Sequence, residues 1–232
     1  MFVHVMKAAV AAVRLLFRNR RTWLLLGLLY AALLFAGYVF VSTREATVTQ
    51  LVVTLGSILS AAVLAVALVA VSVNYVSKTG VKKILADCLR IFAVSVPLIV
   101  ITAVVVYGLG KFGSQLTTVV ATRYLLAGVV APLVAIQLWI AASRGGLGST
   151  IRGFREIAIQ AVAPQSILVY GCGLLFFAVA PYFLIFHTMP IERAWLELSL
   201  LVARLVLSAL LILFGWVATV GTLSVLSQEH VN

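Results

Sequence analysis

Uncharged, predominantly apolar runs separate the charged residues of this chain, and their lengths predict its architecture. The longest run covers residues 46–77 and contains no Asp, Glu, Lys, Arg or His between Glu45 and Lys78. About 20 helical residues cross the roughly 30 Å hydrocarbon core of a bilayer, so this run is long enough to span it. Its Gly and Ser residues are dispersed rather than clustered at a turn, which favours one helix over a hairpin.

Five further runs extend this pattern and predict an all-α, polytopic transmembrane helical bundle with six spans. Pro97 near the start of the third span is compatible with a kink or a new helix start inside a bundle. No polar or low-complexity segment is long enough to be a linker, so we interpret residues 1–232 as a single transmembrane domain. The expected spans are about 22–43, 48–76, 92–110, 124–142, 164–186 and 199–226.

Small residues within two spans predict close contacts between helices. Ala127, Ala131 and Ala135 repeat at four-residue spacing in the fourth span, and Gly171 and Gly173 lie in the fifth. Helices can approach one another closely where side chains are small. We therefore expect packing along the alanine face, and packing or local flexibility at the two glycines.

Residues 2–21, 81–90 and 150–160 lie outside the spans and have basic, amphipathic patterns at helical spacing. Such helices lie in the headgroup layer, with the apolar side toward hydrocarbon and the cations on lipid phosphate. We expect three interfacial helices on the cytoplasmic face, with packing on other parts of this protein as the alternative for the first. Its apolar side consists of Phe2, Met6, Val10, Val13 and Phe17, and its basic side of His4, Lys7, Arg14 and Arg18.

The second amphipathic stretch places a carboxylate among cations. Asp87 follows Lys83 by four residues, a spacing that allows a weak ion pair on a helix surface. Gly80 can end the preceding helix and let the chain bend. The predicted polar face consists of Lys82, Lys83, Asp87 and Arg90, and the apolar face of Val81, Ile84, Leu85, Cys88 and Phe92.

Residues 143–150 include three glycines and superficially resemble a phosphate-binding loop. A P-loop requires a preceding strand and a Lys-Ser or Lys-Thr pair that opens the next helix, and neither is present. The sequence instead predicts a flexible turn, after which Ser149 or Thr150 caps the third amphipathic helix.

The distribution of basic residues orients the six spans. Five lie before the first span, four between the second and third, and three between the fourth and fifth, which places twelve on one side. The other side carries Arg44, Lys111, Arg123 and Arg193. Because cytoplasmic loops are enriched in Lys and Arg, we expect both termini in the cytoplasm and the protein in a plasma membrane of the bacterial inner-membrane type.

The same cations define the expected partners. The net charge of +11 is interleaved with apolar runs and forms no basic stripe or motif, so no nucleic-acid partner is expected. The expected partners are anionic lipids on the cytoplasmic side, together with other protein subunits. The residues assigned to headgroup or partner contacts are Lys7, Arg14, Arg18, Arg20, Arg21, Lys82, Lys83, Arg152 and Arg155.

Composition agrees with a membrane protein. Hydrophobic residues make up 64% of the chain and charged residues 10%, against about 25% charged residues in soluble domains. Cys88 and Cys172 alone cannot form the disulfide framework of a small secreted protein. The basic region before residue 22 is long and no cleavage site follows it, which favours a retained first span over a signal peptide.

Few side chains in this sequence can perform catalysis. The six acidic residues have no spacing that would hold two carboxylates together within a span, so we expect no catalytic residue, cofactor or metal site. A metal site built from His187, Glu192 and Glu197 is conceivable, but an ordinary polar turn explains these residues better.

Arg204 is the main intramembrane charge. A cation at mid-bilayer costs at least about 2.5 to 3.5 kcal/mol on insertion scales. Three outcomes remain open: snorkelling to the outer headgroups, an ion pair with Glu197, or contact with an anion or lipid headgroup inside the bundle. The next polar candidates, for which hydrogen bonds between helices are the commoner use, are Asn74, Gln137, Tyr75 and Tyr170.

Together these features predict a non-enzymatic inner-membrane protein, either a transport permease or an integral subunit of a larger membrane complex. With an amphipathic helix before the first of six spans and residues 81–90 between the second and third, the layout resembles that of permeases of ATP-driven exporters. Those proteins have an interfacial helix and a coupling helix at these places, so the resemblance implies work with a separate ATPase. A structural or assembly factor that transports nothing is the other alternative.

Overall fold

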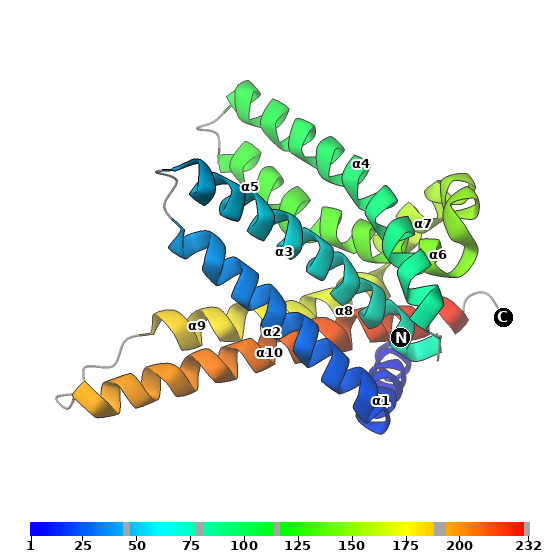
Figure 1. Ribbon diagram of the computed structural model, residues 1–232. Coiled ribbons are helices and arrows are strands. Elements are labelled where there is room, and N and C mark those ends of the chain that lie inside the picture. Colours follow the sequence, from blue (N-terminus) through cyan, green and yellow to red (C-terminus); the bar gives the residue numbers. More distant parts are fainter. Residues whose placement is uncertain (44–46, 78–80, 114–116, 188–193, 230–232) are drawn as a thin grey trace. The chain divides into compact units, whose positions relative to one another are not determined.

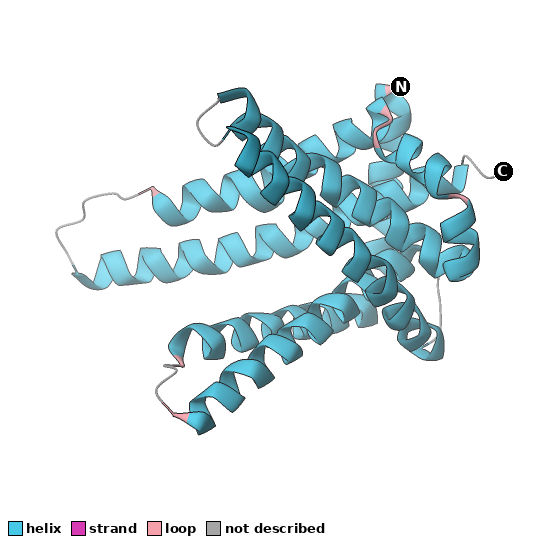
Figure 2. Cartoon of the chain, turned by 90° about the horizontal axis from the view of Figure 1, so that it is seen from above, coloured by secondary structure: helices cyan, strands magenta, loops and turns pink. Residues whose placement is uncertain are grey.

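The computed structural model describes residues 1–43, 47–77, 81–113, 117–187 and 194–229. These residues form helices and short connections, with no strand among them (Figures 1 and 2). Six of the described helical segments are long and apolar enough to cross a membrane, which confirms the predicted all-α, six-span class in length and composition. They are Arg20–Ser42, Val48–Asn74, Lys83–Lys111, Thr117–Arg152, Pro164–Phe186 and Trp195–Gln228.

The chain divides into two compact units. The first unit contains residues 1–13 and 164–232, and the second contains residues 14–163. The boundary therefore falls within the first helix, α1 (Phe2–Arg18). The expectation of a single transmembrane domain stays a prediction.

In the second unit, each membrane-spanning segment packs against the one that follows it in the sequence. Helix α2 packs along α3, α3 contacts α4, and α4 packs against α6 (Figure 1). The elements are α2 (Arg20–Ser42), α3 (Val48–Asn74), the 3₁₀ turn η1 (Tyr75–Ser77), α4 (Val81–Gly113), α5 (Thr117–Leu125), the π turn η2 (Leu126–Val130), α6 (Ala131–Arg152) and α7 (Phe154–Ala161).

Polar side chains cap the N-termini of two of these helices. Oδ1 of Asn19 accepts a hydrogen bond from the backbone N–H of Thr22 at 3.3 Å, and Oγ1 of Thr47 accepts one from that of Gln50 at 3.3 Å. Each bond satisfies a backbone donor that has no partner within the first turn of a helix. Asn19 thereby separates α1 from the first span.

Helix α4 joins the second amphipathic stretch to the third span. We expected a separate surface helix over residues 81–90, but α4 runs from Val81 to Gly113 without a break, so that expectation is wrong. Pro97 lies inside this helix rather than at its start. Gly80, which we expected to end the preceding helix, lies outside the described residues.

The predicted glycine turn occurs within α6. Gly146 has φ 79° and ψ 174°, a conformation that breaks the helix and that glycine adopts without a steric penalty. The hydroxyls of Ser149 and Thr150 donate to the carbonyl of Gly146 at 3.0 and 2.9 Å. These two residues therefore bond back to the turn rather than capping α7.

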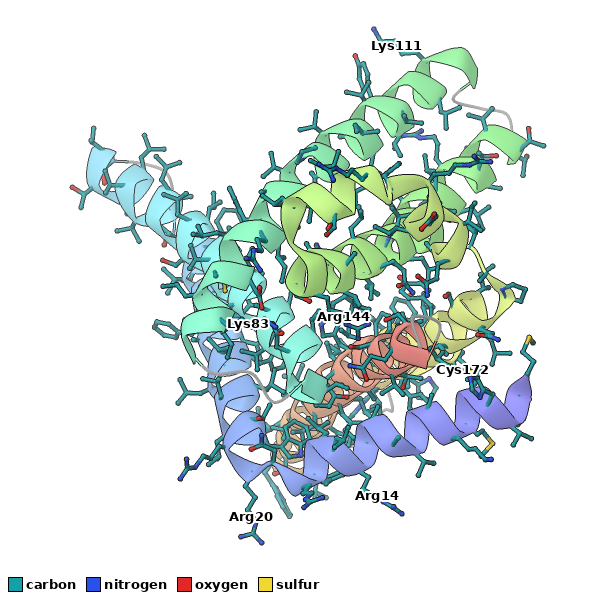
Figure 3. All side chains as sticks on the ribbon, turned by 90° about the vertical axis from the view of Figure 1, so that its right-hand side faces the viewer. Arg14, Arg20, Lys83, Lys111, Arg144 and Cys172 are labelled. Carbon is teal, nitrogen blue, oxygen red and sulfur yellow. The ribbon has the colours of Figure 1, made fainter. Side chains whose placement is uncertain are left out.

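The first unit contains the fifth and sixth spans. Helix α10 packs along α8, η3 and α9. The first turns of α1 cross α8 and α10 at a steep angle (Figures 1 and 3). The elements of this unit after α1 are α8 (Pro164–Leu174), the π turn η3 (Leu175–Val179), α9 (Ala180–Phe186) and α10 (Ala194–Glu229).

Two π turns accommodate prolines in the fourth and fifth spans. Both η2 and η3 begin with Leu, end with Val and are followed directly by Ala and then by Pro132 or Pro181. Proline lacks a backbone N–H, and its ring clashes with the carbonyl four residues earlier. The wider π turn before each proline relaxes this constraint, so both helices continue past the proline.

Candidate functional site

One residue of the predicted polar face of α4 is buried, although Lys83 of the same face is exposed. Asp87 is 0% exposed, and Ile91, one turn later, is 1% exposed. By contrast, Leu85 and Leu89 are 71% and 70% exposed. The leucines therefore face outward, and the carboxylate faces the neighbouring helices. The expectation that Asp87 lies on a solvated polar face is wrong.

Asp87 is held by partners from two elements. Its Oδ2 accepts a hydrogen bond from Nδ2 of Asn74, the last residue of α3, at 2.9 Å. Its Oδ1 accepts one from the guanidinium of Arg90 at 3.2 Å. In the described part of the chain the ion pair of Asp87 is therefore with Arg90 rather than with Lys83. Burial of a carboxylate is tolerated only when it is paired and hydrogen-bonded, and these two partners meet that requirement.

Asn74 is itself fixed in place. It is 4% exposed, and its Nδ2 also donates to the carbonyl of Ala70 at 3.0 Å. Its amide thus links the end of α3 to the start of α4 through the carboxylate of Asp87. We name Asn74, Asp87 and Arg90 the Asp87 cluster.

A small cavity borders this cluster. Its volume is about 60 Å³, and its polar lining comes from Asn19 and Thr22 on one side and from Asn74 and Tyr75 on the other. Leu25, Val71 and Ile84 complete the lining, so the cavity is partly polar and is large enough to hold water. Asn74 therefore contacts the buried carboxylate and also lines a partly polar cavity between α2 and α3.

A second polar contact lies further along the same face of α4. Ser95 follows Ile91 by one turn, and its hydroxyl donates to the carbonyl of Ile91 at 2.7 Å. The same hydroxyl accepts a hydrogen bond from Nε1 of Trp139 on α6 at 2.8 Å. The inward face of α4 thus carries Asp87, Ile91 and Ser95 at four-residue spacing and uses side-chain hydrogen bonds toward both α3 and α6.

In the first unit, Arg204 binds the end of a neighbouring helix. Its guanidinium donates to the carbonyls of Leu184 and His187, which lie at the C-terminal end of α9. The last carbonyls of a helix lack partners within the helix and carry partial negative charge, so a cation is favourable there. Glu197 is exposed and lies earlier on α10. The three outcomes expected from the sequence for Arg204 did not include these carbonyls.

The cations assigned to headgroups or partners are exposed wherever their side chains are described, and they are distributed over several helices. Figure 3 shows Arg14 and Arg20 projecting away from the ribbon. The side chain of Lys82 lies outside the described residues. The polar candidate Gln137, by contrast, is buried, with 3% of its surface exposed. The exposed cations are Lys7, Arg14, Arg18, Arg20, Arg21, Lys83, Arg152 and Arg155.

Among the described residues, no three His, Cys, Asp or Glu side chains are placed to hold a metal ion. No protein-family model, curated protein or solved structure matches this chain significantly. The described residues themselves define its class as an all-helical, multi-pass membrane protein.

Proposed function

We propose that this chain is a non-enzymatic transport permease of a bacterial-type plasma membrane, working alone or as an integral subunit of a larger complex. Both termini would lie in the cytoplasm, because twelve Lys and Arg residues precede or connect spans on that side. The Asp87 cluster would then lie at the cytoplasmic end of the third span.

The observation that carries this proposal is the burial of Asp87 at the start of a membrane-spanning helix. Ionisable side chains enclosed among spanning helices are costly and characteristically mark substrate or ion pathways. Here the carboxylate is held by a neutral amide and by Arg90, whose side chain is 38% exposed. The adjoining, partly polar cavity supplies a space in which water can approach Asn74.

The exposed side chains of α1 support its placement at the membrane surface. Phe2 and Met6 are 60% and 53% exposed, and Lys7 is exposed on a different side of the helix. Apolar side chains of this size are favourable in the outer part of the hydrocarbon layer, and a cation is favourable among phosphates. The steep crossing of α8 and α10 by α1 would place it along the membrane plane (Figures 1 and 3).

Solute profiling tests the transport function and requires no assumption about the substrate. Cells overproducing the protein, Asp87→Asn or the matched control Glu156→Gln would be compared by untargeted mass spectrometry of cell extracts and medium. Glu156 is exposed on α7, so its amide variant changes the same charge outside the cluster. We expect the parent protein and Glu156→Gln to shift the same solute and Asp87→Asn not to. Identical profiles for all three proteins, at equal membrane abundance, would contradict the proposal.

Copurification distinguishes the alternatives. A stoichiometric ATPase recovered with the detergent-solubilised protein would indicate an ATP-driven exporter permease, although α4 lacks the separate coupling helix on which that resemblance is based. Recovery of a respiratory or envelope complex, with unchanged solute profiles, would indicate a structural or assembly factor.

Side-specific cysteine labelling tests the proposed orientation. Single cysteines would replace Lys83 and Arg152, both exposed, in a protein in which Cys88 and Cys172 are changed to Ala. We expect an impermeant maleimide to label these cysteines only after the cells are opened and the cytoplasmic side of the membrane is accessible. Labelling from outside intact cells would overturn the orientation.

A further inference from the structure

An apolar cavity lies in the first unit between α1 and the helices of the fifth and sixth spans. Its volume is about 320 Å³. Met6 and Ala9 line it from α1, Cys172 and Phe176 from α8 and η3, and Ala218 from α10. Figure 3 labels Cys172 on the side of α8 near α1.

The helices beneath this cavity are in close contact. A Cβ placed on Gly173 would lie 2.0 Å from Oγ1 of Thr219, and one on Gly215 would lie 3.0 Å from Cβ of Phe176. Real Cβ atoms essentially never come as close as the first distance and rarely as close as the second, so α8 and η3 meet α10 directly at these glycines. The cavity is therefore bounded by a close contact between spanning helices on one side and by α1 on the other.

The walls of the cavity present little polarity to an occupant. Thr219 and Thr222 also line it, but their hydroxyls donate to the carbonyls of Gly215 and Ala218 at 2.6 and 2.7 Å. Their hydrogen-bond donors are thus used within α10. An occupant must therefore be apolar over the part that enters the cavity, since a polar group would lose its hydrogen bonds to water.

We infer that this cavity binds one acyl chain of an anionic phospholipid. Ligand pockets are about 300 to 1,000 Å³, so the cavity is at the small end and fits one chain better than a two-chain lipid body. The spanning helices are solvated by lipid, which makes an acyl chain the apolar ligand present at the highest concentration. This inference does not depend on the proposed transport function.

The charge of α1 selects an anionic headgroup. The part of the helix that belongs to the first unit, residues 1–13, contains Lys7 and no Asp or Glu. Lys7 lies one residue from Met6 on the cavity wall, and its exposed side chain can extend along the surface to a phosphate while the chain of the lipid lies below α1. Each such cation near a membrane surface contributes about 1 kcal/mol toward anionic lipid, which corresponds to about a fivefold preference.

Native mass spectrometry of the full-length protein tests this inference. The protein would be delipidated in mild detergent and then exposed to an equal mixture of phosphatidylglycerol and phosphatidylcholine. We expect one retained lipid per chain, with phosphatidylglycerol preferred. Ala9→Phe fills the cavity and should lower retention about tenfold, whereas the matched change Ala11→Phe, at an exposed position of the same helix, should not. Lys7→Gln should lower the preference for phosphatidylglycerol but not the total.

Photo-crosslinking supplies a measurement that needs no variant. Phosphatidylglycerol with a diazirine near the middle of one chain should crosslink to residues 2–13 and 168–176 of the parent protein, with excess unlabelled phosphatidylglycerol competing. Supporting results are these crosslinks together with selective loss in Ala9→Phe. Equal retention by Ala9→Phe and Ala11→Phe, equal binding of the two lipids, or crosslinks spread evenly over all spans would each overturn the inference.

Discussion

The two units connect their helices by different kinds of contact. In the second unit, side chains reach across: Asp87 binds Asn74, and Trp139 binds Ser95. In the first unit the backbone itself takes part, because α8 approaches α10 at Gly173 and Arg204 binds the terminal carbonyls of α9. Contacts of the first kind depend on the chemical identity of both partners, whereas close backbone approach depends on the absence of a side chain.

This difference indicates where chemistry can reside. Close contacts at glycine leave no free polar group, so they hold helices together without offering a polar binding site. Buried ionisable groups among spanning helices are costly and characteristically mark ion or substrate pathways. The proposed transport function therefore concerns the second unit, and the proposed lipid binding concerns the first.

Removal of the buried carboxylate should produce the largest loss of stability. Asp87→Ala leaves Asn74 and Arg90 without their shared acceptor, and we expect a loss of about 3 kcal/mol because breaking a buried pair at one partner is strongly destabilising. Equilibrium unfolding in mixed micelles would measure it. Asp87→Asn should lose less, since its amide oxygen can still accept from Asn74. A change equal to that of the exposed control Glu156→Ala would show that the carboxylate is not buried.

Loss of the helix-end contact should have the next largest effect. Arg204→Met keeps an unbranched apolar side chain but removes both hydrogen bonds to the carbonyls at the end of α9, with an expected loss of about 2 kcal/mol. Arg155→Met at an exposed position is the control. Hydrogen exchange should also increase at the end of α9 in Arg204→Met. Unaltered exchange there would contradict the capping role.

Adding one methyl group should change the stability differently at two nearby glycines. Gly173→Ala places Cβ against Thr219 and should lose about 1.5 kcal/mol through overpacking. Gly171→Ala meets nothing within 4 Å and should be neutral or slightly stabilising, because alanine favours helix. The double variant Gly173→Ala, Thr219→Ala should recover much of the loss. Equal effects at the two glycines would disprove the close approach of α8 and α10.

We expect the smallest loss of stability when the hydrogen bond between Trp139 of α6 and Ser95 of α4 is removed. Trp139→Phe removes the indole donor to Ser95 and should lose about 1 kcal/mol, the usual net value of one hydrogen bond, beyond any change in packing. Ser95→Ala removes the other partner, so the combined variant should lose less than the sum of the two. Strict additivity of the two losses would argue against the bond.

Hydrophobic run length was sufficient to predict six spans, because a bilayer demands long uncharged helices whatever their packing. It could not predict the orientation of α4. The same pattern of alternating leucines and charges occurs whether the apolar side faces protein or lipid, and here Leu85 and Leu89 face outward while Asp87 faces inward. In a membrane, an amphipathic pattern identifies two faces without saying which one is buried.

Small residues were informative only in part. Of the packing or flexibility expected at the two glycines, packing occurs at Gly173, whereas a Cβ on Gly171 would meet nothing within 4 Å. Of the three alanines in the fourth span, only Ala135 is buried and Ala127 is exposed. Spacing alone does not show which side of a helix meets a neighbour. The partners of Arg204 were equally hidden, since backbone carbonyls at a helix end leave no signature in the residue types around them.

A double-mutant cycle on Asn74 and Asp87 tests the central claim of a buried, specifically bonded carboxylate most directly. Unfolding free energies would be measured for the parent, Asn74→Ala, Asp87→Ala and the double variant. The 2.9 Å bond between Nδ2 of Asn74 and Oδ2 of Asp87 predicts that the losses are not additive, with a coupling energy of about 1 kcal/mol or more. Additive losses, with a coupling energy near zero, would contradict the account.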